Sequence, residues 1–111
     1  MKVAVPTANG SLAMHFGHCD QFAIIEVDNE GNILSREDKT PPLHEPGVLP
    51  EWLHKIGVTD IVAGGMGTRA MILFKQNGIN VIIGAPGTNP ETLAEACAKG
   101  TLDSGDNICS H

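Results

Sequence analysis

Two short apolar runs in the second half of the chain constrain the fold most. Residues 60–63 (Asp-Ile-Val-Ala) and residues 80–83 (Asn-Val-Ile-Ile) each lead into a glycine-containing turn and then a helical pattern. Continuous apolar runs of this length are typical of strands that a parallel sheet buries on both faces. Alternation of such strands with helices predicts an α/β protein with right-handed crossovers.

The two helices that follow these runs have recognisable ends. The first is expected over residues 68–77, where Gly78 ends it, and the second from about Pro90 to Lys99, where Gly100 ends it. Asn89 is a good N-cap residue, and proline suits the first helical position.

The first half of the chain predicts a meander and one further helix. Pro6 is expected to stop the first strand and to begin a long loop over residues 6–19. Asn-Glu-Gly-Asn at residues 29–32 is a turn signal between two strands, which predicts a hairpin. The expected strands cover residues 2–5, 22–28 and 33–38, and the helix covers residues 47–55.

This order brings distant loops together. If the first, third, fourth and fifth strands are parallel and the second runs against them, four carboxyl ends share one edge of the sheet. Ligands of open α/β sheets bind at that edge. The segments that we expect there are residues 6–19, 40–48, 64–67 and 84–87.

Metal-competent side chains are concentrated in one of these loops and at the end of the chain. His15, His18 and Cys19 fall within five residues, and Cys109 and His111 close the sequence. Imidazole and thiolate are ligands of zinc and of other transition metals, so both clusters are candidate metal ligands. The alternatives are an ordinary loop with exposed histidines and a frayed chain end.

The remaining histidines and cysteine carry less weight. His44 lies beside Glu45 on a proline-rich loop, and its role stays open. His54 is expected at the surface of a helix, and Cys97 is expected to be a buried apolar residue of the last helix.

The glycines before the first predicted βα helix form a candidate anion site. Backbone N–H groups of Gly65, Met66, Gly67 and Thr68 are placed to meet an anion at the helix N-terminus. Arg69 is unfavourable for the helix dipole in the first turn, and a bound anion would offset that cost. The sequence is neither a Walker A loop nor a GxGxxG motif, so a simple tight turn remains the alternative.

Composition narrows the class of function. The chain has 111 residues, a net charge of -6 and no basic cluster, which disfavours a nucleic-acid-binding protein. No apolar run approaches the length of a membrane span or a signal peptide, so we expect a cytoplasmic protein of one domain with its cysteines as thiols. There is no Ser/His/Asp motif, and no paired carboxylates stand near the glycine turns, which favours a binding protein over an enzyme.

Several motifs, in their order and spacing, resemble the dinitrogenase iron–molybdenum cofactor family, which includes NifX, NafY and the C-terminal domain of NifB. The residues that carry the resemblance are 1–6, 15–19, Phe22, 64–67, Ala70 and 78–81. It covers residues 1–100 and leaves residues 101–111 as a C-terminal tail.

The resemblance implies a ribonuclease H-like, three-layer α/β fold with helices on both faces of a mixed five-stranded sheet in the order 3-2-1-4-5. It implies a carrier of an iron–molybdenum or related metal–sulfur cluster, related to nitrogen fixation, with a cofactor-assembly protein as a partner. His15 matches the family's His-Phe-Gly position, whereas His18 and Cys19 match a variable stretch. The radical-SAM cysteine motif of full-length NifB is absent, so that activity is not expected.

Three other functions remain open. A protein that binds a single zinc, nickel or copper ion would use the same ligands. A ribonuclease H-like enzyme acting on phosphates would need clustered carboxylates for Mg²⁺, and residues 2–5 hold none. A protein–protein adaptor would use none of the metal-competent residues.

Overall fold

A computed structural model describes residues 1–8, 11–12, 20–41, 48–83 and 89–99. Strands and helices alternate in its second half, as the apolar runs predicted. The elements in chain order are β1 (Lys2–Ala8), β2 (Ser11–Leu12), β3 (Gln21–Val27), β4 (Ile33–Lys39), α1 (Val48–Lys55), β5 (Asp60–Val62), α2 (Thr68–Gln76), β6 (Asn80–Ile82) and α3 (Pro90–Lys99).

The strands form one mixed sheet with β1 at its centre. The main path is β4-β3-β1-β5-β6, and the two-residue strand β2 pairs with β1 off this path. β3 runs antiparallel to both β1 and β4, whereas β5 and β6 are parallel to β1. With β2 set aside, this is the predicted order 3-2-1-4-5, so the predicted mixed α/β sheet is confirmed.

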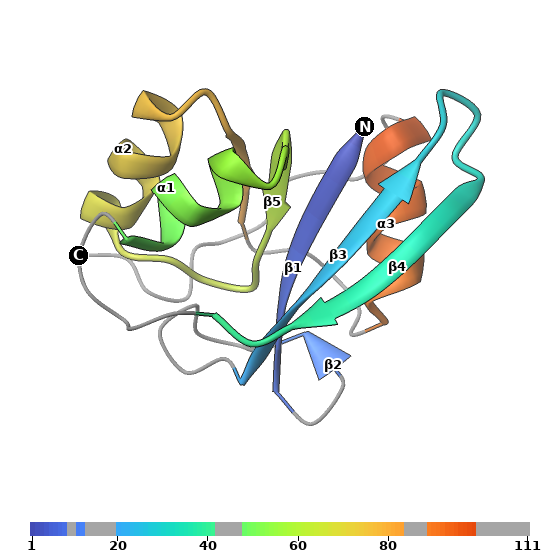
Figure 1. Ribbon diagram of the computed structural model, residues 1–111, viewed down its shortest axis with the longest axis horizontal. Coiled ribbons are helices and arrows are strands. Elements are labelled where there is room, and N and C mark those ends of the chain that lie inside the picture. Colours follow the sequence, from blue (N-terminus) through green and yellow to red (C-terminus); the bar gives the residue numbers. More distant parts are fainter. Residues whose placement is uncertain (9–10, 13–19, 42–47, 84–88, 100–111) are drawn as a thin grey trace.

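Helices cover both faces of the sheet and make three layers (Figure 1). On one face, Leu53 of α1 and Phe74 of α2 pack over Ala4, Ile24 and Ile61. On the other face, α3 packs over β1 and β3 through Leu93 and Ala94. The alternation of side chains along β1 and β3 therefore supplies apolar residues to two separate cores.

The central strand is longer than predicted. Residues 3–7 of β1 are all buried, and the strand passes through Pro6 to Ala8. The prediction that Pro6 stops the strand, with residues 6–19 as a loop, was therefore wrong at its start and at β2. Pairing with β5 ends at Ala4, so Pro6 lies beyond the ladder on that side, where a strand tolerates the missing N–H.

The helix boundaries follow their capping residues. The Asn89 side chain accepts hydrogen bonds from the backbone N–H groups of Glu91 (2.9 Å) and Thr92 (3.3 Å), as an N-cap residue does. Gly78 has a φ of 73°, and the chain turns there from α2 into β6. Both signals were predicted from the sequence, and both are confirmed.

The predicted hairpin between β3 and β4 is stabilised by one aspartate. The Asp28 carboxylate accepts hydrogen bonds from the backbone N–H groups of Glu30 and Asn32, each at 2.9 Å. The bonds from Asn32 are the main cause that holds the pKa of Asp28 below its ordinary value. The pairing register of β3 and β4 shifts between Glu26 and Val27, and Leu34 of β4 is exposed.

The last helix ends beside this hairpin turn. A Cβ atom on Gly31 would lie 2.6 Å from the Lys99 side chain, so the end of α3 lies against the turn between β3 and β4. Because β3 runs antiparallel to β1, this turn is at the edge of the sheet where β1 begins. α3 therefore ends at the edge opposite the carboxyl ends of the parallel strands, as predicted.

A buried carboxylate lies at the same edge, and two exposed residues donate to it. Asp60 is only 6% exposed, and its carboxylate accepts hydrogen bonds from the Thr59 hydroxyl (2.7 Å) and the Asn80 side-chain amide (3.2 Å). A buried carboxylate is costly without such donors. The bond from Asn80 also joins the first residue of β6 to the first residue of β5. None of the described helices is long and apolar enough to cross a membrane.

Two leucines test the assignment of the core. Leu53 is completely buried, whereas Leu34 is 61% exposed. We expect Leu53→Ala to lower the free energy of unfolding by about 2–5 kcal/mol, and Leu34→Ala by less than about 0.5 kcal/mol. Urea unfolding followed by circular dichroism measures both, and equal losses would contradict the packing of α1 on the sheet.

Candidate functional site

The carboxyl ends of four strands form one edge of the sheet. β1, β5 and β6 are mutually parallel, and β4 is parallel to β1 because both run antiparallel to β3. The segment after β5 crosses from this edge into the first turn of α2 (Figure 1). The predicted convergence of strand ends is thus confirmed for the described residues.

Burial changes sharply along the segment that joins β5 to α2. Gly64, Gly65 and Met66 are buried, Gly67 is half-buried, and the side chains of Thr68 and Arg69 are exposed. Met66 has no exposed surface and packs in the core with α1 and α2. Within this segment, Gly67, Thr68 and Arg69 are therefore the residues that solvent reaches, and the Met66 side chain is inaccessible to it.

The N-terminus of α2 has the electrostatic character of an anion-binding end. The N-cap Gly67 is extended (φ −66°, ψ 152°), and no side chain caps the helix by a hydrogen bond. The first turn holds no acidic residue, and its only charge is the Arg69 guanidinium. The positive end of the helix dipole and the arginine charge therefore add together, at a cost that a bound anion would remove.

Arg69 makes no ion pair within the described part of the chain. The ion pairs there involve the other basic side chains Arg36, Lys39 and Lys55. Arg69 is therefore available to a ligand at this edge, and exposure means that its contribution is screened by salt.

The same region contains a buried polar residue and an aromatic pair. Thr7, near the end of β1, is 4% exposed, and its hydroxyl donates to the Gln21 carbonyl at 3.2 Å. Trp52 of α1 contacts Phe22 edge to face, with ring centroids 5.9 Å apart. Thr7 was not predicted as a buried residue because the first strand was expected to end at Pro6. Its position two residues after Val5, on the same face of the strand, was the available signal.

The predicted metal ligands lie outside the described residues. This applies to His15, His18, Cys19, Cys109 and His111, and also to His44. Within the described ranges, no group of three His, Cys, Asp or Glu side chains is placed to hold a metal ion. His54 is exposed on α1, as predicted.

Comparison with known families identifies the chain. The sequence profile of the dinitrogenase iron-molybdenum cofactor family matches residues 1–100. The chain belongs to this family.

Its relatives include the uncharacterized protein MJ0580 of Methanocaldococcus jannaschii, which is 37% identical over 86 residues, or 73% of this chain and 72% of that protein. Two solved structures share the fold. PH0822 has a TM-score of 0.81 and 24% identity over 95% of this chain and 96% of its own. The apo form of the orange protein from Desulfovibrio gigas has a TM-score of 0.75 and 19% identity over 96% and 93%.

The described part of the edge carries positive charge. The N-terminus of α2 presents a helix dipole and Arg69. Carboxylates are absent from the first turn of the helix.

Cys97 is a different kind of thiol from a metal ligand. It is half-buried on α3 and packs against the core that α3 shares with β1 and β3. Burial, and secondly the negative charge of Asp60, raises the pKa of the Cys97 thiol from 9.0 to about 11. The interpretation of Cys97 as a structural residue is supported, although it is half-buried rather than fully buried.

The rate of alkylation of Cys97 tests whether its thiol is buried and has a raised pKa. A raised pKa lowers the fraction of Cys97 present as the reactive thiolate. The higher nucleophilicity of that thiolate makes up for only part of the loss in reaction rate. In a Cys19→Ser/Cys109→Ser variant at about pH 8, we therefore expect Cys97 to react with iodoacetamide about 10-fold or more slowly in the folded protein than in guanidinium chloride. Equal rates in the two states would contradict the burial of Cys97.

Proposed function

We propose that this protein binds an anionic metal–sulfur cluster of the iron–molybdenum cofactor type and carries it in cofactor assembly or storage. The observation that carries the proposal is the uncapped N-terminus of α2, with Arg69 and no acidic residue in its first turn, at the carboxyl edge of the sheet. Family membership supports the chemical class of the cargo.

The described residues supply positive charge and backbone hydrogen-bond donors. In this proposal they attract and orient the cluster, and they form no bond to its metals. Backbone N–H groups at the start of α2 form the positive end of the helix, and Arg69 adds a full charge in its first turn. Donors of this kind favour sulfide-rich clusters over neutral molecules. They would hold such a cluster without a covalent change to it.

The metal bonds are assigned to residues 15–19, which lie between β2 and β3 in the sequence, and to residues 109–111. In this proposal His15 is the principal ligand, His18 and Cys19 add to it, and Cys109 and His111 close the site from the tail. Imidazole and thiol must lose protons to bind a metal, so binding should weaken as the pH falls.

We assign no catalytic turnover to the protein. The only buried carboxylate among the described residues is Asp60, which lies at the opposite edge with its own hydrogen-bond donors. A single-ion zinc, nickel or copper protein, a phosphate-processing enzyme and an adaptor are the competing functions.

Charge reversal at the helix terminus tests the anion site. The probe is tetrathiomolybdate, a soluble molybdenum–sulfide anion, and the readout is quenching of Trp52, the only tryptophan in the chain. We expect Arg69→Glu to weaken binding by about 5-fold to 10-fold at low salt, because it replaces an attraction by a repulsion at a surface site. Lys75→Glu, in the last turn of α2, should have a much smaller effect.

Loss of folding is not expected to explain weaker binding by Arg69→Glu. Glutamate in the first turn of a helix is favourable, so Arg69→Glu should fold at least as well as the parent protein. Unchanged tetrathiomolybdate affinity in a folded Arg69→Glu protein would remove the helix N-terminus from the site.

Metal and sulfide analysis tests the ligand assignment. Protein purified without oxygen should contain metal together with acid-labile sulfide, and His15→Ala and Cys19→Ala should each lose most of both. His54→Ala, which changes an exposed histidine on α1, is the matched control and should keep them. Metal without sulfide would indicate the single-ion alternative, and unchanged content in both variants would contradict the assignment.

A further inference from the structure

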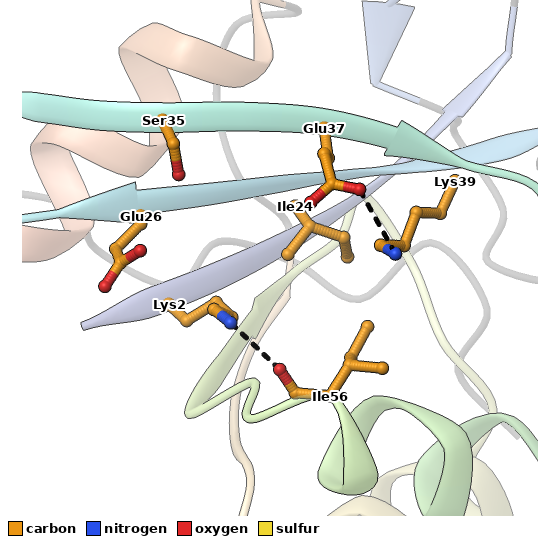
Figure 2. Close-up of a pocket in the computed structure, with 7 residues that line it drawn as sticks. All are labelled: Lys2, Ile24, Glu26, Ser35, Glu37, Lys39 and Ile56. Carbon is orange, nitrogen blue, oxygen red and sulfur yellow. Dashed lines mark hydrogen bonds and ion pairs between the residues drawn. The ribbon is translucent and has the colours of Figure 1, made fainter.

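A pocket of about 160 Å³ lies on the sheet (Figure 2), and no residue of the proposed cluster site lines it. It opens over β3 and β4, on the face that α1 and α2 cover elsewhere. Lys2 pairs with Glu26, and Glu26 pairs with Ser35, so these side chains form a row across three strands on that face. Ile24, which is 6% exposed, and the half-buried Ile56 provide its apolar part.

Lys2 and Glu26 are neighbours of opposite charge that do not pair with each other. The Lys2 ammonium instead donates to the Ile56 carbonyl at 2.9 Å, just past the end of α1 (Figure 2). Within the described part of the chain, neither the Glu26 carboxylate nor the Ser35 hydroxyl has a hydrogen-bond partner. The Lys2 ammonium therefore lies against the backbone after α1 and not against the Glu26 carboxylate, and both charged groups line the pocket.

The other two charges of the pocket neutralise one another. Lys39 and Glu37 form an ion pair of 3.2 Å along β4. The unused hydrogen-bonding capacity of the pocket is therefore of two kinds: the remaining N–H groups of Lys2, and the acceptor oxygens of Glu26 and Ser35.

We propose that this pocket binds a small aliphatic α-amino acid in its zwitterionic form. The ammonium group of the ligand lies between Glu26 and Ser35, its carboxylate accepts from Lys2, and its side chain covers Ile24 and Ile56. Adjacent charges of opposite sign on the ligand match adjacent charges on the wall. No covalent step is involved.

The small volume of the pocket favours a small ligand. A volume of about 160 Å³ suits a molecule of about six to eight heavy atoms, such as L-alanine or L-valine. Glu26 and Ser35 are exposed, so the pocket is open to solvent. A simple anion would meet the Glu26 carboxylate, and a simple cation would meet the Lys2 ammonium, so neither is as well matched.

The test is a titration of the full chain with L-valine, followed by amide chemical shifts. We expect saturable shifts, in the millimolar range, at Lys2, Glu26, Ser35 and their neighbours. Isobutylamine and isovalerate each keep one charge and the branched chain, and each should bind at least about fivefold more weakly because one charged hydrogen bond is lost. Absence of saturation up to about 50 mM L-valine would overturn the proposal.

A matched pair of variants locates the site. Glu26→Gln should weaken L-valine binding at least about fivefold, whereas Glu30→Gln, the same change in the exposed hairpin turn, should leave it unchanged. Both positions are exposed, so neither change should prevent folding. Equal affinity in Glu26→Gln and the parent protein would overturn the assignment even if L-valine binds elsewhere.

Discussion

Burial of β1 on both of its faces is the constraint on which the structure depends. Val3 and Val5 enter the core under α3, and Ala4 enters the core under α1 and α2. A strand that is apolar on both sides must have a layer on each, which requires helices before and after the parallel strands. The position of the proposed cluster site follows, because the carboxyl ends of the strands parallel to β1 then share one edge.

The fold was largely predictable because its signals are local and agree with one another. The apolar runs at residues 60–63 and 80–83, the N-cap at Asn89 and the positive φ of Gly78 all point to the same elements. The error at Pro6 has a tertiary cause. Proline is incompatible with a ladder on both sides, and only the pairing register shows that β5 stops at Ala4 and leaves one side free. No single-strand pattern contains that information.

The residues of the candidate sites were predictable from the sequence to different degrees. The glycine turn and Arg69 were predicted from the sequence, and the structure confirms that they lie at the N-terminus of α2 on the expected edge. Assignment of His15, His18, Cys19, Cys109 and His111 as ligands stays a prediction, since they lie outside the described residues. The pocket beside Lys2 could not be predicted. Its charges depend on the Ile56 carbonyl, which is distant in sequence and captures the Lys2 ammonium.

The two proposed sites differ in what creates them. At the edge of the sheet, a helix begins and offers positive charge to a large anion, whereas beside α1 a helix ends and holds a lysine away from its acidic neighbour. The central claim concerns the first site. Anomalous X-ray scattering at the molybdenum edge, from crystals of protein loaded with tetrathiomolybdate, tests it most directly. The account predicts a molybdenum peak beside Gly67 and Arg69, at the N-terminus of α2. A peak at the opposite edge of the sheet, near Cys97, would contradict it.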